Sequence, residues 1–462
     1  MQFILLLILI SLIIKLSKSI EKNFILPFQF RSFNINNNNI NSKETDFLYE
    51  LAYSQIITTI KIGTPSKAFN FTISLQNYLT YILSSDFTLK KIKGNSSLLL
   101  FNKENSETYL NNTNLEYFDE ELISSGYYSS DIFIFENENE IKKFNFILGM
   151  NVYDEKLLLI YNNSANLGFK LTQNYNFLYE SENSTILKNL YENHVIKQMT
   201  FTLEFNNSDD NNNKINNFFN DKGNLIFDID FSDANKYFII KTGLIENIMK
   251  NYEWAFNFDY LYYGDIEIDD VQNCLIESEF GLILGTDEFK KIIDENFFNK
   301  YYTESCILKK TDIIYDEKDY VLSYYECNKN ININYMNDIV FRLTINEFNI
   351  VFNSNDLFID FNDKKIFLIV FKDFNKNWIF GRIFLKKYQT FFDKDKKILG
   401  FKKSEIKNKN RYNIKFVIII IFLSLFILGL ICFIVYLYLF KKIPRKFRSN
   451  EIIEEYNYIP QN

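Results

Sequence analysis

The sequence predicts a mainly β protein built as two related halves. Between residues 50 and 403, short runs of alternating apolar and polar residues are separated by turns rich in Asn, Asp and Lys, which is the pattern of half-buried strands. Gly168 and Gly381 each close a short stretch with apolar residues, and they follow Ser74 and Glu277 at similar intervals. Two copies of one half-structure would produce that spacing. A chain of 462 residues can bury a core in each half.

The N-terminus predicts a cleaved signal peptide. Residues 3–14 form an apolar run too short to span a bilayer comfortably, and Ser17-Lys18-Ser19 resembles a signal-peptidase site. We therefore expect residues 1–19 to be removed and residues 20–49 to form a loose leader. Because a basic n-region is missing, an uncleaved anchor is the alternative.

We expect a first β lobe over residues 50–235 and a second over 236–403. "DLFIDFNDKKIFLIVF" predicts a hairpin about Asn362-Asp363, and "STILKNLYENH" and "TDEFKKIIDENF" predict the two helices. The second helix has Thr286 or Asp287 as its N-cap. The apolar helix faces consist of Ile186, Leu187, Leu190 and Tyr191 in the first and of Phe289, Ile292 and Ile293 in the second.

The C-terminal part predicts a membrane anchor. Residues 416–440 carry no charge, and as a helix at about 1.5 Å per residue they exceed the roughly 30 Å hydrocarbon core. Basic residues follow at once, so the positive-inside rule places the tail 441–462 in the cytosol. Residues 404–415 are then a linker in a type I protein of the secretory pathway, with an endolysosomal or cell-surface membrane as its destination.

A luminal location fits six N-glycosylation sequons. Their restriction to the first half indicates that the second half is shielded. The acceptor candidates are Asn70, Asn95, Asn111, Asn162, Asn183 and Asn206.

Composition excludes several classes of function. The net charge is -7, and no basic stripe with interleaved aromatics precedes the C-terminal tail, so we expect no nucleic-acid partner. The chain has one histidine and lacks the cysteine spacing of zinc sites, so we expect no metal site and no cofactor.

Nearly all of residues 50–403 resembles the pepsin-like aspartic peptidases. The matching segments correspond to the start of the first lobe, the strand after the flap, the passage between the lobes (two segments) and the closing signature of the family. In chain order they are "YSQIITTIKIGTPSKAFNFTI", "SSGYYSSDIFIF", "GNLIFDID", "YEWAFNFDYLYYGDIEI" and "NWIFGRIFLKKYQTFFDKDKKILGF". The resemblance implies a bilobal fold whose loops at Ser74 and Glu277 face each other across a cleft.

The two catalytic Asp-Thr/Ser-Gly loops of that family are degenerate here. In the family, two carboxylates share one proton, loop hydroxyls brace the lobes, and glycine lets backbone N–H groups approach each carboxylate. The matching triplets in this chain are Ser74-Leu75-Gln76 and Glu277-Ser278-Glu279. No Asp-Thr-Gly or Asp-Ser-Gly occurs anywhere in the sequence, so a shifted alignment does not restore the pair.

Three other features follow from the resemblance. Tyr117 could stand at the position of the flap tyrosine, with an ordinary core or surface aromatic as the alternative. Cys306 and Cys327 enclose a hairpin-sized segment where the family has a disulfide, which leaves Cys274 as a buried free thiol and Cys432 within the membrane segment. His194 falls in a segment that resembles a surface helix and loop, so we do not expect it to activate Ser74.

Two functions remain open. The leading interpretation is a membrane-anchored, inactive peptidase homologue whose cleft binds or regulates polypeptides, and the alternative is an active endopeptidase that uses Glu277 with an acid such as Glu279. In the tail, Tyr456 and Ile459 fit a tyrosine-x-x-apolar sorting signal for an adaptor protein. Because such short motifs also arise by chance, an ordinary disordered tail is the alternative there.

Overall fold

The computed structural model describes residues 23–31, 48, 51–87, 98–118, 123–136, 139–152, 164–171, 183–206, 222–230, 237–242, 254–269, 273–315, 318–343, 348–402, 429–431 and 433–437. The chain divides into two compact units, residues 1–403 and 404–462. The first unit is mainly β, as the sequence predicts.

The strands of the first unit form three sheets in the described residues. The largest has the order β11 (Tyr237–Lys241), β26 (Ile398–Lys402), β25 (Thr390–Asp393), β9 (Thr200–Phe205), β10 (Lys222–Phe227), β1 (Ile25–Arg31), β2 (Gln55–Ile62), β3 (Lys67–Ser74), β8 (Ala165–Gly168), β4 (Tyr81–Leu83), β7 (Glu140–Val152), β6 (Ile123–Ile134) and β5 (Leu110–Tyr117).

The other two sheets belong to the second lobe. One has the order β12 (Ala255–Asn257), β15 (Asn273–Ile276), β24 (Trp378–Phe380), β16 (Ile283–Gly285), β23 (Ile369–Lys372), β18 (Lys318–Asn328), β22 (Lys364–Phe367) and β21 (Phe358–Phe361), with β17 (Cys306–Tyr315) paired to β18. The last has the order β14 (Ile266–Ile268), β13 (Tyr260–Tyr263), β19 (Ile339–Leu343) and β20 (Phe348–Phe352).

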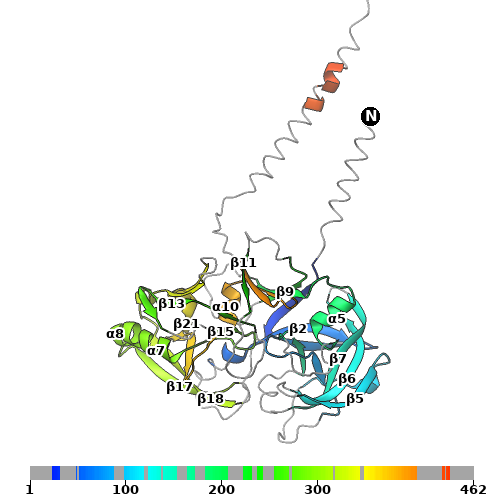
Figure 1. Ribbon diagram of the computed structural model, residues 1–462, viewed down its shortest axis with the longest axis horizontal. Helices are drawn as coiled ribbons and strands as arrows, with labels where there is room; N and C mark the ends of the chain where they lie inside the picture. Colours follow the sequence, from blue (N-terminus) through cyan, green and yellow to red (C-terminus); the bar gives the residue numbers. More distant parts are fainter. Residues whose placement is uncertain are drawn as a thin grey trace, which may run out of the picture. The chain divides into compact units, whose positions relative to one another are not determined.

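One pairing joins the two lobes in a single sheet. Strand β25 of the second lobe runs antiparallel to β9 of the first, and the Thr202 hydroxyl donates to the Thr390 carbonyl at 2.7 Å. In Figure 1, β9 and β11 lie between β5–β7 on one side and β13, β17 and β18 on the other. The rings of Phe201 and Phe392 stack across this pairing at 4.6 Å. The lobes therefore share backbone hydrogen bonds and buried aromatic area.

A repeated strand arrangement places the two loops of interest. In the first lobe β3 is parallel to β8, β8 antiparallel to β4, and β4 parallel to β7; in the second lobe β15, β24, β16 and β23 repeat this pattern. Ser74 pairs with Gly168 at the end of β3, and Ile276 pairs with Phe380 at the end of β15. The similar spacing in the sequence thus corresponds to a repeated structure.

Glycine is required at the same place in both repeats. A Cβ on Gly168 would lie 2.3 Å from the Tyr78 carbonyl oxygen, and one on Gly381 would lie 2.2 Å from the carbonyl oxygens of Phe280 and Leu282. In each case the backbone that follows the loop passes directly over the glycine. Any side chain there would displace the loop.

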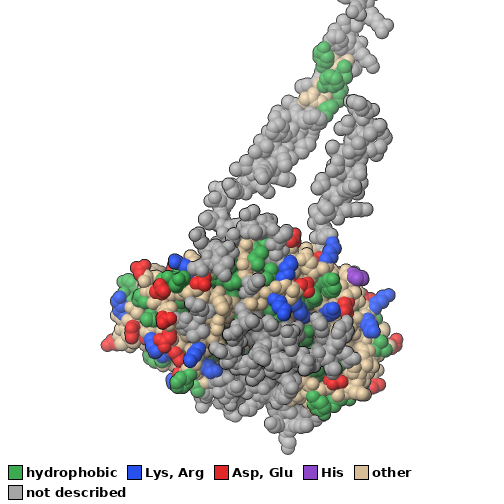
Figure 2. Space-filling model, viewed as in Figure 1, with side chains coloured by type: hydrophobic (Ala, Val, Ile, Leu, Met, Phe, Trp, Pro, Cys, Tyr) green, Lys and Arg blue, Asp and Glu red, His purple; other side chains and the backbone are tan. Residues whose placement is uncertain are grey.

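Surface and core separate as the strand periodicity predicts. Strand β2 alternates outward-facing Thr59 and Lys61 with the buried Ile60 and Ile62. Aromatic rings fill much of the interior, for example Phe133 and Phe144, which stack at 4.0 Å. On the face shown in Figure 2, the described acidic and basic side chains are interspersed.

The helices are short. In the described part of the first unit they include α5 (Ile186–Glu192), α7 (Asp287–Ile293), a π-helical turn (Asp294–Phe298), α8 (Asn299–Tyr301), α9 (Ser354–Leu357) and α10 (Arg382–Lys387), together with 3₁₀ turns at Lys103–Asn105 and Ile333–Tyr335. Both predicted helices are confirmed, and Thr286 rather than Asp287 is the N-cap of α7. Tyr191 does not belong to the buried face of α5, because its side chain is 42% exposed.

Two expectations about local structure were wrong. Residues 25–31, expected within a loose leader, form β1, which pairs with β10 and β2 and buries Leu26 and Phe28. The flanking Asn-rich composition hid this apolar alternation. The second miss is α10, whose buried face contains Ile383, Phe384 and Leu385. Six residues are too few for a helical period to stand out in the sequence.

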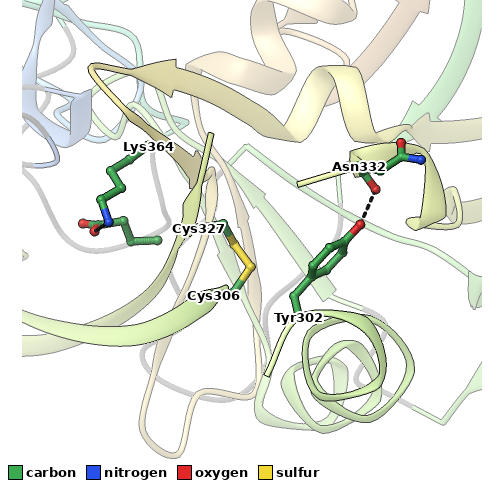
Figure 3. Close-up of a disulfide and its surroundings, with 6 residues drawn as sticks. Tyr302, Cys306, Cys327, Asn332 and Lys364 are labelled. Atoms are coloured by element: carbon green, nitrogen blue, oxygen red, sulfur yellow. Dashed lines mark hydrogen bonds and ion pairs between the residues drawn. A yellow bond between two sulfur atoms is a disulfide. The ribbon is translucent and has the colours of Figure 1, made fainter. Parts of the chain in front are cut away.

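The disulfide implied by the resemblance is present. Cys306 and Cys327 are directly opposed on β17 and β18 and are joined through their sulfur atoms. Figure 3 shows this bond between Tyr302, whose hydroxyl donates to the Asn332 carbonyl at 2.7 Å, and Lys364, which forms an ion pair with buried Glu326. Cys274 is a buried free thiol, as expected.

Several expectations fall on residues that the structure does not describe. These are the signal peptide, the linker, the tail with Tyr456 and Ile459, Cys432, and the sequons at Asn95 and Asn162. Of the predicted membrane segment, residues 429–431 and 433–437 are described and are helical. Within the described residues, no helix has the length and hydropathy needed to span a bilayer.

Tyr388 provides a test of the packing in the second lobe. Its hydroxyl accepts from the Val351 N–H at 2.7 Å and donates to the Val351 carbonyl at 2.9 Å, and burial raises its pKa from 10.0 to about 12. Because the pKa is higher in the folded state, the shift contributes to the free energy of unfolding. This contribution is complete below pH 10 and is lost as the pH rises through 12. We expect Tyr388→Phe to lower the free energy of unfolding by about 1–2 kcal/mol at neutral pH. The variant should also lose less stability than the parent between these two pH values.

Denaturant titrations at neutral and alkaline pH would measure both effects. The matched control is Tyr301→Phe, since the Tyr301 side chain is 43% exposed. If Tyr388→Phe and the parent lost equal amounts of stability at alkaline pH, the prediction would be contradicted.

Candidate functional site

The first candidate position, Ser74, is fully buried at the end of β3. Its hydroxyl oxygen accepts from the backbone N–H groups of Gln76 and Asn77 at 3.2 and 2.8 Å, and from the Asn77 side-chain amide at 2.9 Å. Its carbonyl accepts from the Phe169 N–H at 2.8 Å. Ser74 therefore organises its own loop, and its hydroxyl is not exposed to attack a substrate.

The two loops contact each other through Ser278. Its hydroxyl donates to the Ile73 carbonyl at 3.0 Å and accepts from the Leu75 N–H at 2.9 Å. All three groups are buried, so these bonds form away from competing water. The hydroxyl of the second triplet is thus a brace between the lobes.

The reciprocal brace is different, because Leu75 has no hydroxyl. Leu75 is buried, and the Gln76 side-chain amide donates to the Ile276 carbonyl at 3.5 Å instead. A contact of this length is at the limit of a hydrogen bond. The bracing of the loops is therefore asymmetric.

Asn77 makes a second polar contact between the lobes. Its side-chain amide donates both to the Ser74 hydroxyl and to the Glu279 carboxylate, at 2.9 and 3.0 Å. Asn77 and Glu279 are both partly buried. The contact between these two residues was not predicted from the sequence, because Asn77 lies just outside the degenerate triplet and Glu279 replaces a glycine of the family motif.

Glu277 is the buried carboxyl group of the second loop. Its side chain is 6% exposed, and its backbone N–H donates to the Phe380 carbonyl at 3.0 Å.

Cys274 is a buried thiol near Glu277. Burial, with a smaller contribution from the Glu277 charge, raises the pKa of the Cys274 thiol well above its ordinary value. Cys274 therefore stays a neutral thiol and is not a nucleophile.

Tyr117 lies on the surface. It is the last residue of β5, pairs with Ser125 of β6, and is 79% exposed. The next residue, Phe118, is buried against Tyr128 in a small aromatic cluster. Of the two aromatics at this end of the hairpin, Phe118 makes the packing contacts.

The other candidate chemistries find no support in this region. His194 is exposed in the turn after α5, whereas Ser74 is fully buried. Among the described residues, no group of three or more His, Cys, Asp or Glu side chains is placed to hold a metal ion.

Three of the described sequon asparagines, Asn70, Asn111 and Asn206, are exposed, and Asn183 is partly exposed.

The arrangement has one buried carboxyl group where an acid pair would be needed. A shared-proton mechanism needs two adjacent carboxylates, and the first position offers a serine oxygen that already accepts three hydrogen bonds. The nearest further carboxylate along the chain, Glu279, is hydrogen-bonded to Asn77. The bonds present serve to fix the two loops against each other.

Comparison with known proteins identifies one family. The model of the family described as eukaryotic aspartyl protease matches residues 55–404. The search of curated proteins finds no match.

Ser278 tests the brace. Ser278→Ala leaves the buried Leu75 N–H and Ile73 carbonyl without this partner, so we expect the free energy of unfolding to fall by about 2–3 kcal/mol. Ser278→Thr keeps the hydroxyl and should retain most of the stability. Denaturant titration measures the change, with the exposed Ser66→Ala as the control. Equal stabilities of Ser278→Ala and Ser66→Ala would show that the brace contributes nothing.

Proposed function

Because the chain belongs to the eukaryotic aspartyl protease family, we propose that it is a catalytically inactive member that binds polypeptides between its lobes. The observation that carries the proposal is the state of Ser74. This residue occupies the end of β3, where the family has its first catalytic aspartate, and its buried hydroxyl is taken up by hydrogen bonds within its own loop.

The loss of one acid is decisive for the chemistry. General acid–base catalysis contributes about 10²- to 10⁴-fold per group, and the pair acts as a unit because one member must be charged while the other donates. With Ser74 in the first loop no proton is shared. Glu277 alone would have to perform both roles.

An endopeptidase that uses Glu277 and Glu279 is the competing function. Against it, the first loop provides Ser74 in place of a carboxyl group, and the Glu279 carboxylate is hydrogen-bonded to Asn77 of that loop. The retained fold and the brace through Ser278 favour a binding role, since both keep the surface between the lobes in place. The same surface would hold an extended peptide in an active relative.

We also propose a type I membrane location in the secretory pathway. Its support is the uncharged segment 416–440 and the basic residues that follow it. The described parts of this segment, 429–431 and 433–437, are helical with exposed apolar side chains. The disulfide between Cys306 and Cys327 fits an oxidising compartment.

The first test is proteolysis. We expect the purified full-length chain not to cleave a denatured protein substrate at acidic pH, because the acid pair is missing. Product formation would be followed by mass spectrometry with and without pepstatin. Pepstatin-sensitive cleavage would overturn the proposed inactivity and favour the Glu277–Glu279 mechanism.

Restoring the acid tests the role of the loops. Ser74→Asp alone should not create activity, because Leu75, Gln76 and Glu279 still occupy the positions of the hydroxyl and the glycines. Restoration of both complete triplets is the positive comparison. Robust cleavage by Ser74→Asp alone would show that the missing carboxylate was the sole defect.

The tail tests the location. If Tyr456 and Ile459 form a sorting signal, Tyr456→Ala or Ile459→Ala should shift the full-length chain from endolysosomal membranes to the cell surface. Tyr458→Ala is the control, since it leaves the spacing of the two anchor residues intact. Surface biotinylation measures the shift. An unchanged distribution of the first two variants would identify the tail as an ordinary disordered end.

A further inference from the structure

The substituted residues of the two loops make a contact that holds the lobes together. The Asn77 side-chain amide lies between Ser74 in its own lobe and Glu279 in the other, at 2.9 and 3.0 Å. An asparagine amide has two hydrogens. One amide group can therefore serve both acceptors at once.

The Ser74 hydroxyl sets the orientation of this amide. Ser74 is fully buried and also accepts the Asn77 backbone N–H at 2.8 Å, so both the backbone and the side chain of Asn77 are fixed to one atom. A side chain held in this way loses little further conformational entropy when it binds Glu279. The bond to Glu279 is also charge-assisted, which makes it stronger than a neutral pair.

We propose that Ser74, Asn77 and Glu279 form a latch that fixes the separation of the two lobes. The latch lies beside the Ser278 brace, and together they tie both loops at the ends of β3 and β15. Other contacts also join the lobes, among them the β9–β25 pairing and the Arg382 side chain, which donates to the Leu51 carbonyl at 2.8 Å. A side-chain contact between the two loops adds to these restraints and further opposes rotation of one lobe against the other.

This inference does not rest on the proposed function. An active or an inactive protein could carry the latch, and its test measures stability and distance, not cleavage. It assigns the substituted positions a definite role. Whether or not the protein is active, they restrict the movement of one lobe against the other.

The first measurement is a double-mutant cycle with Asn77→Ala and Glu279→Ala in the full-length chain. We expect each single substitution to lower the equilibrium constant for folding by about tenfold, and the second to have little further effect once the first is present. Glu279→Gln keeps an acceptor oxygen and should retain most of the stability. Chemical denaturation followed by tryptophan fluorescence reports the changes.

The second measurement separates a latch from a merely stabilising contact. Spin labels at Glu192→Cys on α5 and Glu288→Cys on α7 report the distance between the lobes by electron–electron double resonance. Both sites have exposed side chains; Cys432 is replaced by serine, and the buried Cys274 is left in place. We expect the distance distribution to broaden in Asn77→Ala and Glu279→Ala and to stay narrow in Glu279→Gln.

The control is Asp356→Ala, which removes an ion pair with Lys387 and a helix cap within the second lobe. It should destabilise the protein without changing the distance between the lobes. If an alanine variant does not fold, Asn77→Asp gives the same comparison, because it is isosteric but cannot donate. Coupled losses with a broadened distance support the latch. Additive losses, or an unchanged distance distribution, would overturn it.

Discussion

The pairing of β25 with β9 is the constraint on which the rest of the structure depends. Through this pairing, β1 near the start of the first unit and β26 near its end belong to one sheet. The pairing also brings the aromatic rings of Phe201 and Phe392 into a stack. Trp254 packs on Phe392 and donates to the Phe169 carbonyl at 2.7 Å, so the core is continuous beneath both loops. With the lobes registered in this way, the ends of β3 and β15 meet. The contacts of Ser278 follow from that meeting.

The two loops contain features that packing requires and positions that differ from the family motif. The close approach of backbone to Gly168 and Gly381 is a packing requirement, and it is independent of any carboxylate. The hydroxyl of Ser278 is also structural, since it satisfies two buried backbone groups. By contrast, the residue at the end of β3 must satisfy the nearby N–H donors of Gln76 and Asn77. The Ser74 hydroxyl meets that requirement.

The sequence predicts the repeat but not the particulars of its loops. Alternation identified the strands, and an apolar face identified α5 and α7, because both signals are local periodicities. Strand β1, which pairs with β10 and β2, was missed because the Asn-rich sequence beside it hid its apolar alternation. The disulfide between Cys306 and Cys327 was implied by the family resemblance, and the hairpin of β17 and β18 brings the two residues together.

The sequence by itself determined the family, the repeated half-structure and the absence of both Asp-Thr/Ser-Gly motifs. Each of these can be recognised from the order of residues along a single strand and the loop that follows it. Only the tertiary structure decided what the substituted residues do. The bridge from Asn77 to Glu279 joins residues 202 positions apart, and no local pattern marks either as a partner of the other. Their contact exists because the two lobes place both loop ends at one boundary, where the surrounding sheets fix the separation at which a side-chain hydrogen bond can form.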